Sequence, residues 1–280
     1  IFGALLLSGI DEVNEKLQTV SGEEKNQLLD TMADSVFMPY LVMAIVLTVL
    51  GFLIRKAPLP HVEAAPLEEA NDGKIVKTNI FQFPQLILGV IALFMYVGVE
   101  VIAGDSIIAY GLSLGLPVSQ AKWFTTFTLF AMVGTYALGV ILIPKFLSQT
   151  TALRISGALG IILSLIIVNT SGFTSVLLVA SLGIANALVW PAIWPLAIDG
   201  LGKFTKTGAA FLIMAISGGA ILTPLYGKLV DYLKEVYLAE GMEEIVATSH
   251  SANQGYWILL PAYIIIFLYA LKGHKIKSWN

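Results

Sequence analysis

A carboxylate inside a long apolar run is the most chemically informative feature of this sequence. Glu100 lies in the run 86–101, where a carboxylate must be paired, protonated or in contact with water. Ionisable groups in membrane-spanning segments usually mark a substrate or ion pathway, so we interpret Glu100 as a functional residue. Two alternatives are a structural interhelical hydrogen bond or ion pair, and a position shallow enough to reach the outer membrane interface.

An asparagine and two tryptophans recur at intervals of four residues in the apolar run 175–198: Asn186, Trp190 and Trp194. This spacing places the three side chains on one face of a helix. An amide offers both a donor and an acceptor to a hydroxyl ligand, and indole rings supply apolar walls for the C–H faces of a sugar. The pattern therefore favours a site for a polyhydroxylated ligand. Interhelical hydrogen bonding by Asn186 and lipid-facing or interfacial tryptophans are the competing interpretations.

Prolines and paired glycines mark places where helices could bend or pack closely. Pro191 and Pro195 remove backbone donors within the run 175–198 and predict a break or kink there, as transporters use at binding sites. Gly218 and Gly219 could form a second hinge, although close approach of two helix backbones is the role that we favour for them.

Other chemistries find no support in the sequence. The run 200–203 lacks the glycine spacing of a phosphate-binding loop, and the three histidines lie in predicted loops or tails without metal-ligand spacing. Cysteine is absent, so no thiolate can ligate a metal or act as a nucleophile. The net charge of −3 with dispersed lysines argues against a nucleic-acid partner. We therefore expect no catalytic residues, no metal and no cofactor, in a protein that is not an enzyme.

The elements that must position these residues are membrane-spanning helices. Hydrophobic residues make up 57% of the chain and charged residues 12%, whereas soluble domains are about 25% charged. A span requires about 20 apolar residues. Seven runs qualify: 36–54, 84–108, 124–143, 152–169, 175–198, 208–230 and 256–271. A partial run at 1–10 makes an eighth. The expected fold class is an all-α membrane protein.

Loop charge predicts the orientation of these spans. Eleven of the 16 basic residues fall in one set of alternate loops, and such loops are typically cytoplasmic. We therefore expect a cytoplasmic C-terminus, and residues 11–35 to form an outer loop. The stretch 55–83, with three prolines, is predicted to be a cytoplasmic linker between two helix bundles, 1–54 and 84–280. The helix ends near Pro144 and Pro224 are alike, which indicates weakly an inverted three-plus-three repeat.

Three stretches resemble the fucose and glucose/galactose permeases of the major facilitator superfamily. They are YVGVEV at 96–101, NALVWPAIWPLAIDGLG at 186–202, and AISGGAILTP at 215–224 followed by Gly227 and Asp231. The resemblance extends from residue 36 to the C-terminus. It implies a twelve-helix fold, of which this chain holds part of the fifth helix, the sixth helix and the whole C-terminal six-helix bundle, with the rest of the N-terminal half missing.

The resemblance also implies a function. Glu100 would lie on the seventh helix of such a permease, and Asn186, Trp190 and Trp194 on the tenth, both of which line the central cavity. Tyr96 joins these four as a candidate substrate-binding residue. We expect a proton-coupled hexose symporter that works by alternating access in a bacterial-type inner membrane, with sugar and lipid as partners. A facilitator of another small polar solute, or a non-transporting receptor or scaffold, is the alternative. Because the family's proton-carrying carboxylates lie in the first half, Glu100 is expected to bind sugar.

Overall fold

The computed structural model describes residues 16, 21–56, 77–143 and 145–279, and all regular secondary structure in these ranges is helical. The partial span at 1–10 and most of the predicted linker 55–83 lie outside the described residues. The chain divides into two compact units, one formed by Ile1–Glu63 with Pro117–Trp123 and the other by Ala64–Leu116 with Phe124–Asn280.

The first unit contains the long helix α3 (Glu23–Lys56) and the short helix α5 (Val118–Ala121). Helix α3 contains the predicted span 36–54, but it starts earlier, so residues 23–35 are helical and not the outer loop that we predicted. Glu23 and Glu24 in its first turn and Arg55 and Lys56 in its last turn complement the helix dipole. This favourable end chemistry lets the helix extend beyond its apolar run.

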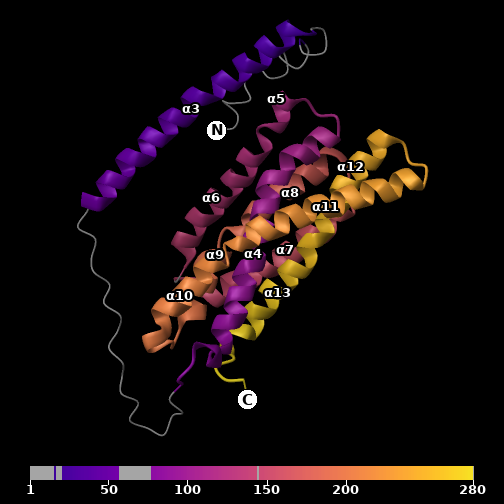
Figure 1. The fold of residues 1–280 in the computed structure, drawn as a ribbon. Helices are drawn as coiled ribbons and strands as arrows, with labels where there is room; N and C mark the ends of the chain where they lie inside the picture. The colour runs from indigo at the N-terminus through magenta and orange to yellow at the C-terminus, as the bar shows by residue number, and fades with distance from the viewer. Residues whose placement is uncertain (1–15, 17–20, 57–76, 144, 280) are drawn as a thin grey trace. The chain divides into compact units, whose positions relative to one another are not determined.

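The second unit is a bundle of long helices that run roughly along one axis (Figure 1). Its α-helices are α4 (Pro84–Ser113), α6 (Phe124–Leu142), α7 (Gln149–Val168), α8 (Gly172–Asn186), α9 (Val189–Ile198), α10 (Thr205–Met214), α11 (Ser217–Ala239), α12 (Glu244–Gln254) and α13 (Leu259–Leu271). Short 3-10 helices are η1 (Ile80–Gln82), η2 (Gly202–Phe204), η3 (Gly255–Ile258) and η4 (Gly273–Lys275). The described residues of the whole chain hold seven helices long and apolar enough to cross a membrane, which confirms the seven predicted spans.

The last three spans are each broken in the middle, whereas α4 and α7 are continuous. Helix α8 ends at Asn186 and α9 begins at Val189, with Leu188 between them at φ −99° and ψ 0°. Pro191 explains the position of this break, because it has no N–H that could donate a hydrogen bond to the carbonyl of Ala187, four residues earlier. The break therefore lies one turn before the proline that causes it, while Pro195 stays inside α9. A second break separates α10 from α11 at Ala215 and Ile216, just before Gly218.

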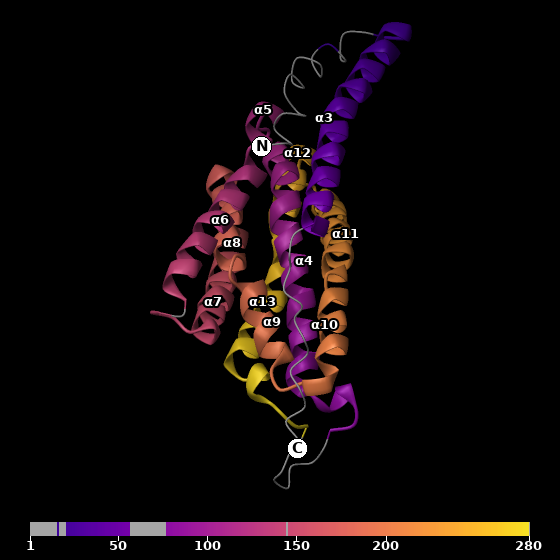
Figure 2. The same ribbon diagram turned by 90° about the vertical axis from the view of Figure 1, so that its left-hand side faces the viewer.

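The pattern of helix pairs supports an inverted repeat. The first triplet is α4, α6 and α7, and the second is α8–α9, α10–α11 and α12–α13. The most extensive contacts join α4 to α11, α6 to α8 and α7 to α13. If each helix of one triplet is exchanged for its counterpart in the other, the pair α4 with α11 becomes the pair α8 with α6. The pair α7 with α13 becomes itself, as a two-fold relation between the triplets requires. Figure 2 shows α6 beside α8 at the left and α10–α11 beside α4 at the right.

Glycines let the two equivalent helix pairs approach to backbone contact. A Cβ atom on Gly218 of α11 would lie 1.9 Å from the carbonyl oxygen of Phe94 on α4. A Cβ atom on Gly183 of α8 would lie 2.3 Å from the carbonyl oxygen of Thr128 on α6. Only glycine avoids these overlaps, so both crossings are fixed by small residues, as is common between membrane helices.

The C-terminal tail joins the start of α4 to the end of α9 at one end of the bundle. The Lys277 ammonium lies 2.7 Å from the Asp199 carboxylate, and the Trp279 indole donates to the carbonyl of Phe81 at 2.7 Å. The Lys77 ammonium donates to the carbonyl of Lys277. Desolvation and, secondarily, the neighbouring Lys277 charge lower the pKa of Lys77. We call this end, where Lys203, Lys206, Lys272 and Lys275 also lie in or beside short helical turns and the start of α10, the basic end.

Candidate functional site

Helices α4 and α9 bring three of the predicted site residues together. The ring centroids of Tyr96 on α4 and Trp190 on α9 are 6.4 Å apart in an edge-to-face arrangement. Trp190 in turn stacks on Trp194, with centroids 5.9 Å apart and an interplanar angle of 18°. Tyr96 is buried, whereas both indole rings are half-buried. The three rings therefore form a continuous aromatic surface across two helices, which we call the aromatic wall.

Glu100 adjoins this wall from α4. One helical turn separates it from Tyr96, and its carboxylate interacts with the hydroxyls of both Tyr96 and Tyr263. Its side chain is half-buried, so the carboxylate is partly accessible at the surface of the bundle. A carboxylate accepts hydrogen bonds through two oxygens, which matches the donors that a sugar hydroxyl presents.

A pocket of about 360 Å³ opens beside the tryptophans. Its lining consists of Trp190, Pro191, Trp194 and Pro195 of α9 and Ile213 of α10. Both prolines line the pocket, and Pro191 also causes the break before α9. Apolar walls with a few polar groups nearby are typical of small-molecule sites.

Asn186 lies apart from this pocket lining. Because the helix breaks between Asn186 and Trp190, the two side chains no longer follow one uninterrupted helical face. Asn186 is fully buried, and its Oδ1 accepts a hydrogen bond of 2.8 Å from the hydroxyl of Tyr263 on α13. This contact is the interhelical hydrogen bond that the sequence left open as an alternative.

The amide of Asn186 is only half satisfied. Its Nδ2 atom is buried and has no hydrogen-bond partner in the structure, and a buried donor left without a partner costs about 1–3 kcal/mol. Among the described residues, the same holds for Gln85 Oε1 and Thr223 Oγ1. An unpartnered amide this close to a break in the helix is a candidate ligand contact, because such groups are rarely kept without a role.

Gly218 and Gly219, our candidates for a second hinge, pack against α4. Gly218 meets the backbone at Phe94, and a Cβ on Gly219 would lie 2.9 Å from Val101 Cγ2. The break between α10 and α11 precedes them by two residues, so these glycines hold the contact with α4 while Ala215 and Ile216 form the break.

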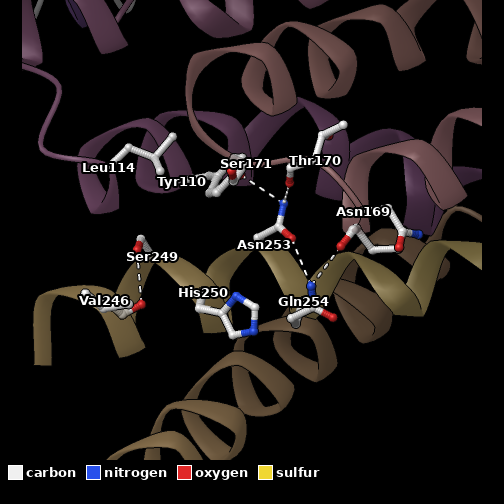
Figure 3. Close-up of a pocket in the computed structure, with 11 residues that line it drawn as sticks. Tyr110, Leu114, Asn169, Thr170, Ser171, Val246, Ser249, His250, Asn253 and Gln254 are labelled. Carbon is white, nitrogen blue, oxygen red and sulfur yellow. Dashed lines mark hydrogen bonds between the residues drawn. The ribbon is translucent and has the colours of Figure 1, made fainter. Parts of the chain in front are cut away.

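A second pocket, of about 310 Å³, lies at the end of the bundle opposite the basic end. Figure 3 shows the Asn253 side chain of α12 reaching between Tyr110 and the turn at Thr170 and Ser171. Its Nδ2 lies 2.9–3.1 Å from the hydroxyls of Tyr110 and Ser175 and the carbonyls of Ile167 and Thr170, and Gln254 donates to the carbonyl of Val168 at 2.9 Å. The two amides thus satisfy carbonyls at the C-terminus of α7, which lack partners within their own helix.

Sequence reasoning missed Tyr263 and Asn253. Both carry a polar group within or beside a run that otherwise reads as a plain span, which was the only signal available. Among the described residues, no group of three His, Asp or Glu side chains could hold a metal ion.

Several known proteins are similar to this chain in sequence. No family in the collection of protein families matches the chain. A glucose/galactose transporter from Brucella abortus is 33% identical over 208 residues, which are 71% of this chain and 48% of the relative. A putative glucose/galactose transporter from Helicobacter pylori is 28% identical over 98% of this chain and 62% of the relative. An L-fucose-proton symporter from Escherichia coli is 24% identical over 86% of this chain and 56% of the relative.

One solved structure shares the fold. The major facilitator superfamily transporter FucP, in its outward conformation, matches 95% of this chain and 60% of its own chain, with a TM-score of 0.67 and 22% identity. The chain spans about half to three fifths of the length of the curated relatives it matches.

Fold and sequence together define a multi-pass integral membrane protein. The chain is similar in sequence to glucose/galactose transporters and L-fucose-proton symporters, and it shares the fold of a major facilitator superfamily transporter. The relatives named here are transporters by name.

Proposed function

We propose that this chain forms the sugar-binding half of a proton-coupled hexose transporter. The observation that carries the proposal is the aromatic wall of Tyr96, Trp190 and Trp194 with the Glu100 carboxylate beside it. Relatives named as glucose/galactose transporters and L-fucose-proton symporters give the ligand class.

The chemistry of the wall suits a hexose. The indole faces of Trp190 and Trp194 offer apolar area for the C–H face of a sugar ring, and the pocket beside them has room for one. Glu100 accepts hydrogen bonds from sugar hydroxyls, and Tyr96 orients the carboxylate from one turn away. Binding needs no covalent step, so none of these residues acts in catalysis.

Transport would proceed by alternating access, with two six-helix halves rocking about the site. The backbone contacts at Gly183 and Gly218 favour a bundle that moves as a body, while the breaks beside Asn186 and Ala215 allow local adjustment. We propose that a further half of similar size completes the cavity and supplies the carboxylates that carry the proton.

The proposed location is a bacterial-type inner membrane, with residues 55–83 as a cytoplasmic linker between the halves. The basic end would face the cytoplasm and include the C-terminus, since basic loops are retained on that side. The outer end would then hold α12 and the pocket around Asn253.

The test is uptake by the full-length protein reconstituted in lipid vesicles. Labelled fucose, glucose and galactose are supplied with and without an inward proton gradient. We expect accumulation of at least one hexose that depends on the gradient. Absence of uptake of all three would sink the sugar proposal, and uptake of another small polar solute instead would favour the broader class of facilitator.

A further inference from the structure

A buried hydrogen bond joins the candidate sugar-binding helix to the last span. The Tyr263 hydroxyl of α13 donates to Asn186 Oδ1 at 2.8 Å, and both residues are fully buried. The partner residues are 77 positions apart in the chain, so the bond is a tertiary contact between α8 and α13. It is the only contact through which a described side chain fixes the orientation of the Asn186 amide.

The ring of Tyr263 is held in place by close packing. A Cβ atom on Gly160 of α7 would lie 2.2 Å from Tyr263 Cδ1, so the ring occupies the space that the missing side chain leaves. Helices α7 and α13 also approach closely at Gly157, where an added Cβ would lie 3.0 Å from the Phe267 backbone. A ring clamped in this way can turn its hydroxyl but cannot move it away, which makes it a rigid reference point for the amide.

The orientation of the amide follows from the donor. A phenol donates a hydrogen bond more readily than it accepts one, so Oδ1 of Asn186 faces Tyr263 and Nδ2 faces elsewhere. Nδ2 is the buried atom without a partner. The Glu100 carboxylate lies close enough to interact electrostatically with Tyr263, so this tyrosine adjoins both the Asn186 amide and the Glu100 carboxylate.

We propose that Tyr263 is a positioning residue for substrate specificity, which locks the Asn186 amide so that Nδ2 is presented to a sugar hydroxyl as a donor. The sugar oxygen at this position then acts as an acceptor. The inference rests on the proposed hexose-binding function. The proposal requires that the buried amide becomes accessible through a change in the angle between α8 and α9 at the break formed by Ala187 and Leu188.

Sugar analogues test the proposal by separating acceptance from donation. A deoxy sugar neither accepts nor donates at the changed position, whereas a fluoro sugar accepts only. The full-length protein is reconstituted, and inhibition of labelled hexose uptake is measured for deoxy and fluoro analogues at each ring position. At one position we expect the deoxy analogue to bind about 10–100-fold more weakly than its parent, and the fluoro analogue within about threefold of it.

Three variants decide the outcome. Tyr263→Phe keeps the ring in the space beside Gly160 but frees the amide to turn. The difference in affinity between the fluoro and deoxy analogues should therefore shrink to about threefold. Tyr269→Phe removes another buried hydroxyl of α13, which donates to the carbonyl of Gln85 at 3.3 Å near the basic end, and should leave the difference unchanged. Asn186→Asp replaces the donor nitrogen by an acceptor oxygen and should abolish the advantage of the fluoro analogue.

Two results would overturn the role of Tyr263 and Asn186, and a third would overturn the proposed function. If Tyr263→Phe discriminates between the analogues as the unmodified protein does, Tyr263 only packs and the proposal fails. If Asn186→Asp retains the fluoro preference, Nδ2 is not the donor, and this result overturns the proposal even where Tyr263→Phe does not fold. Absence of hexose uptake by the unmodified protein overturns the proposed function itself, which separates that failure from the other two.

Discussion

At the scale of single residues, the candidate site pairs one carboxylate with aromatic surface. Glu100 is tolerated in α4 because it is half-buried and has the hydroxyls of Tyr96 and Tyr263 as neighbours. Trp190 and Trp194 are tolerated on α9 because each covers the other. The same features that make these residues stable in a membrane helix leave their polar and apolar faces available to a ligand.

Replacing Glu100 by Gln should weaken sugar binding more than it alters proton coupling. Loss of a hydrogen bond to a charged group costs about 1.5–3 kcal/mol, which corresponds to roughly 10–100-fold in affinity. Equilibrium binding of the sugar and the pH dependence of uptake are measured for both proteins. Asp105→Asn serves as control, since it removes an exposed carboxylate from the same helix. Unchanged binding with a lost pH dependence would instead assign the proton to Glu100.

Residue type and spacing in the sequence predicted part of this site. Glu100 stands out because a charge in an apolar run is rare, and the tryptophans because they recur with helical spacing. Tyr263 was not predictable in the same way, since its partner Asn186 lies 77 positions away and only the packing of α13 on α7 brings them together. The separation of Asn186 from the tryptophan pocket was missed for a related reason, because helical spacing assumes a helix without a break.

At the scale of helices, prolines and glycines determine the geometry of the site. Pro191 breaks the fourth span of the bundle, α8–α9, at a point that hydropathy cannot show, because the apolar run continues through the break. The lengths of two helical stretches were also underestimated, because these helices continue into polar residues beyond the apolar runs. The predicted spans 208–230 and 256–271 lie within longer helical stretches, Gly202–Ala239 and Glu244–Lys275. Residues such as Asp231 and Lys234 continue α11 beyond the apolar region, since helix formation does not require apolar side chains.

Replacing Gly218 by Ala should destabilise the bundle. Its Cβ would overlap the carbonyl oxygen of Phe94, which is backbone and cannot move aside, and overpacking typically costs about 1–3 kcal/mol or more. Gly227→Ala on the same helix is the matched control, since no atom lies within 4 Å of its added Cβ. That control should be neutral or stabilising by about 0.5–1 kcal/mol. Thermal unfolding in detergent measures both, and equal midpoints would contradict the close crossing of α4 and α11.

Replacing Asn253 by Ala should also lower stability, through a different mechanism. The carbonyls of Ile167 and Thr170 would lose a buried donor at the end of α7, at a cost of about 1–3 kcal/mol. Ser249→Ala, which removes only a hydroxyl bonded to its own helix at Val246, is the control. Hydrogen exchange at the C-terminal turn of α7 should accelerate in the first variant and not in the second. Equal protection in both would show that Asn253 does not cap this helix.

At the scale of the whole molecule, the two ends of the bundle differ in chemistry. At the basic end Lys277 pairs with Asp199 and accepts a hydrogen bond from Lys77 through its carbonyl, while the opposite end is held by the amides of Asn253 and Gln254. The distribution of basic residues along the sequence predicted this division. It did not predict the tail contacts, because Lys277 and Asp199 are 78 positions apart.

The two ends should be reached from opposite sides of the membrane. The chain contains no cysteine, so a single substitution gives it one labelling site. Lys203→Cys at the basic end should react with an impermeant thiol reagent only in inside-out vesicles, and Glu240→Cys only in right-side-out vesicles. Both positions are exposed. The reverse pattern would invert the proposed topology.

Sugar-driven proton movement tests the central claim most directly. Vesicles that contain the full-length protein and no imposed gradient are mixed with hexose, and the external pH is recorded. The account predicts that sugar entry makes the external medium more alkaline, and that Trp190→Ala, which opens the aromatic wall, lowers the sugar affinity of this signal about tenfold or more. Sugar entry without any pH change, or an unaltered response in Trp190→Ala, would contradict it.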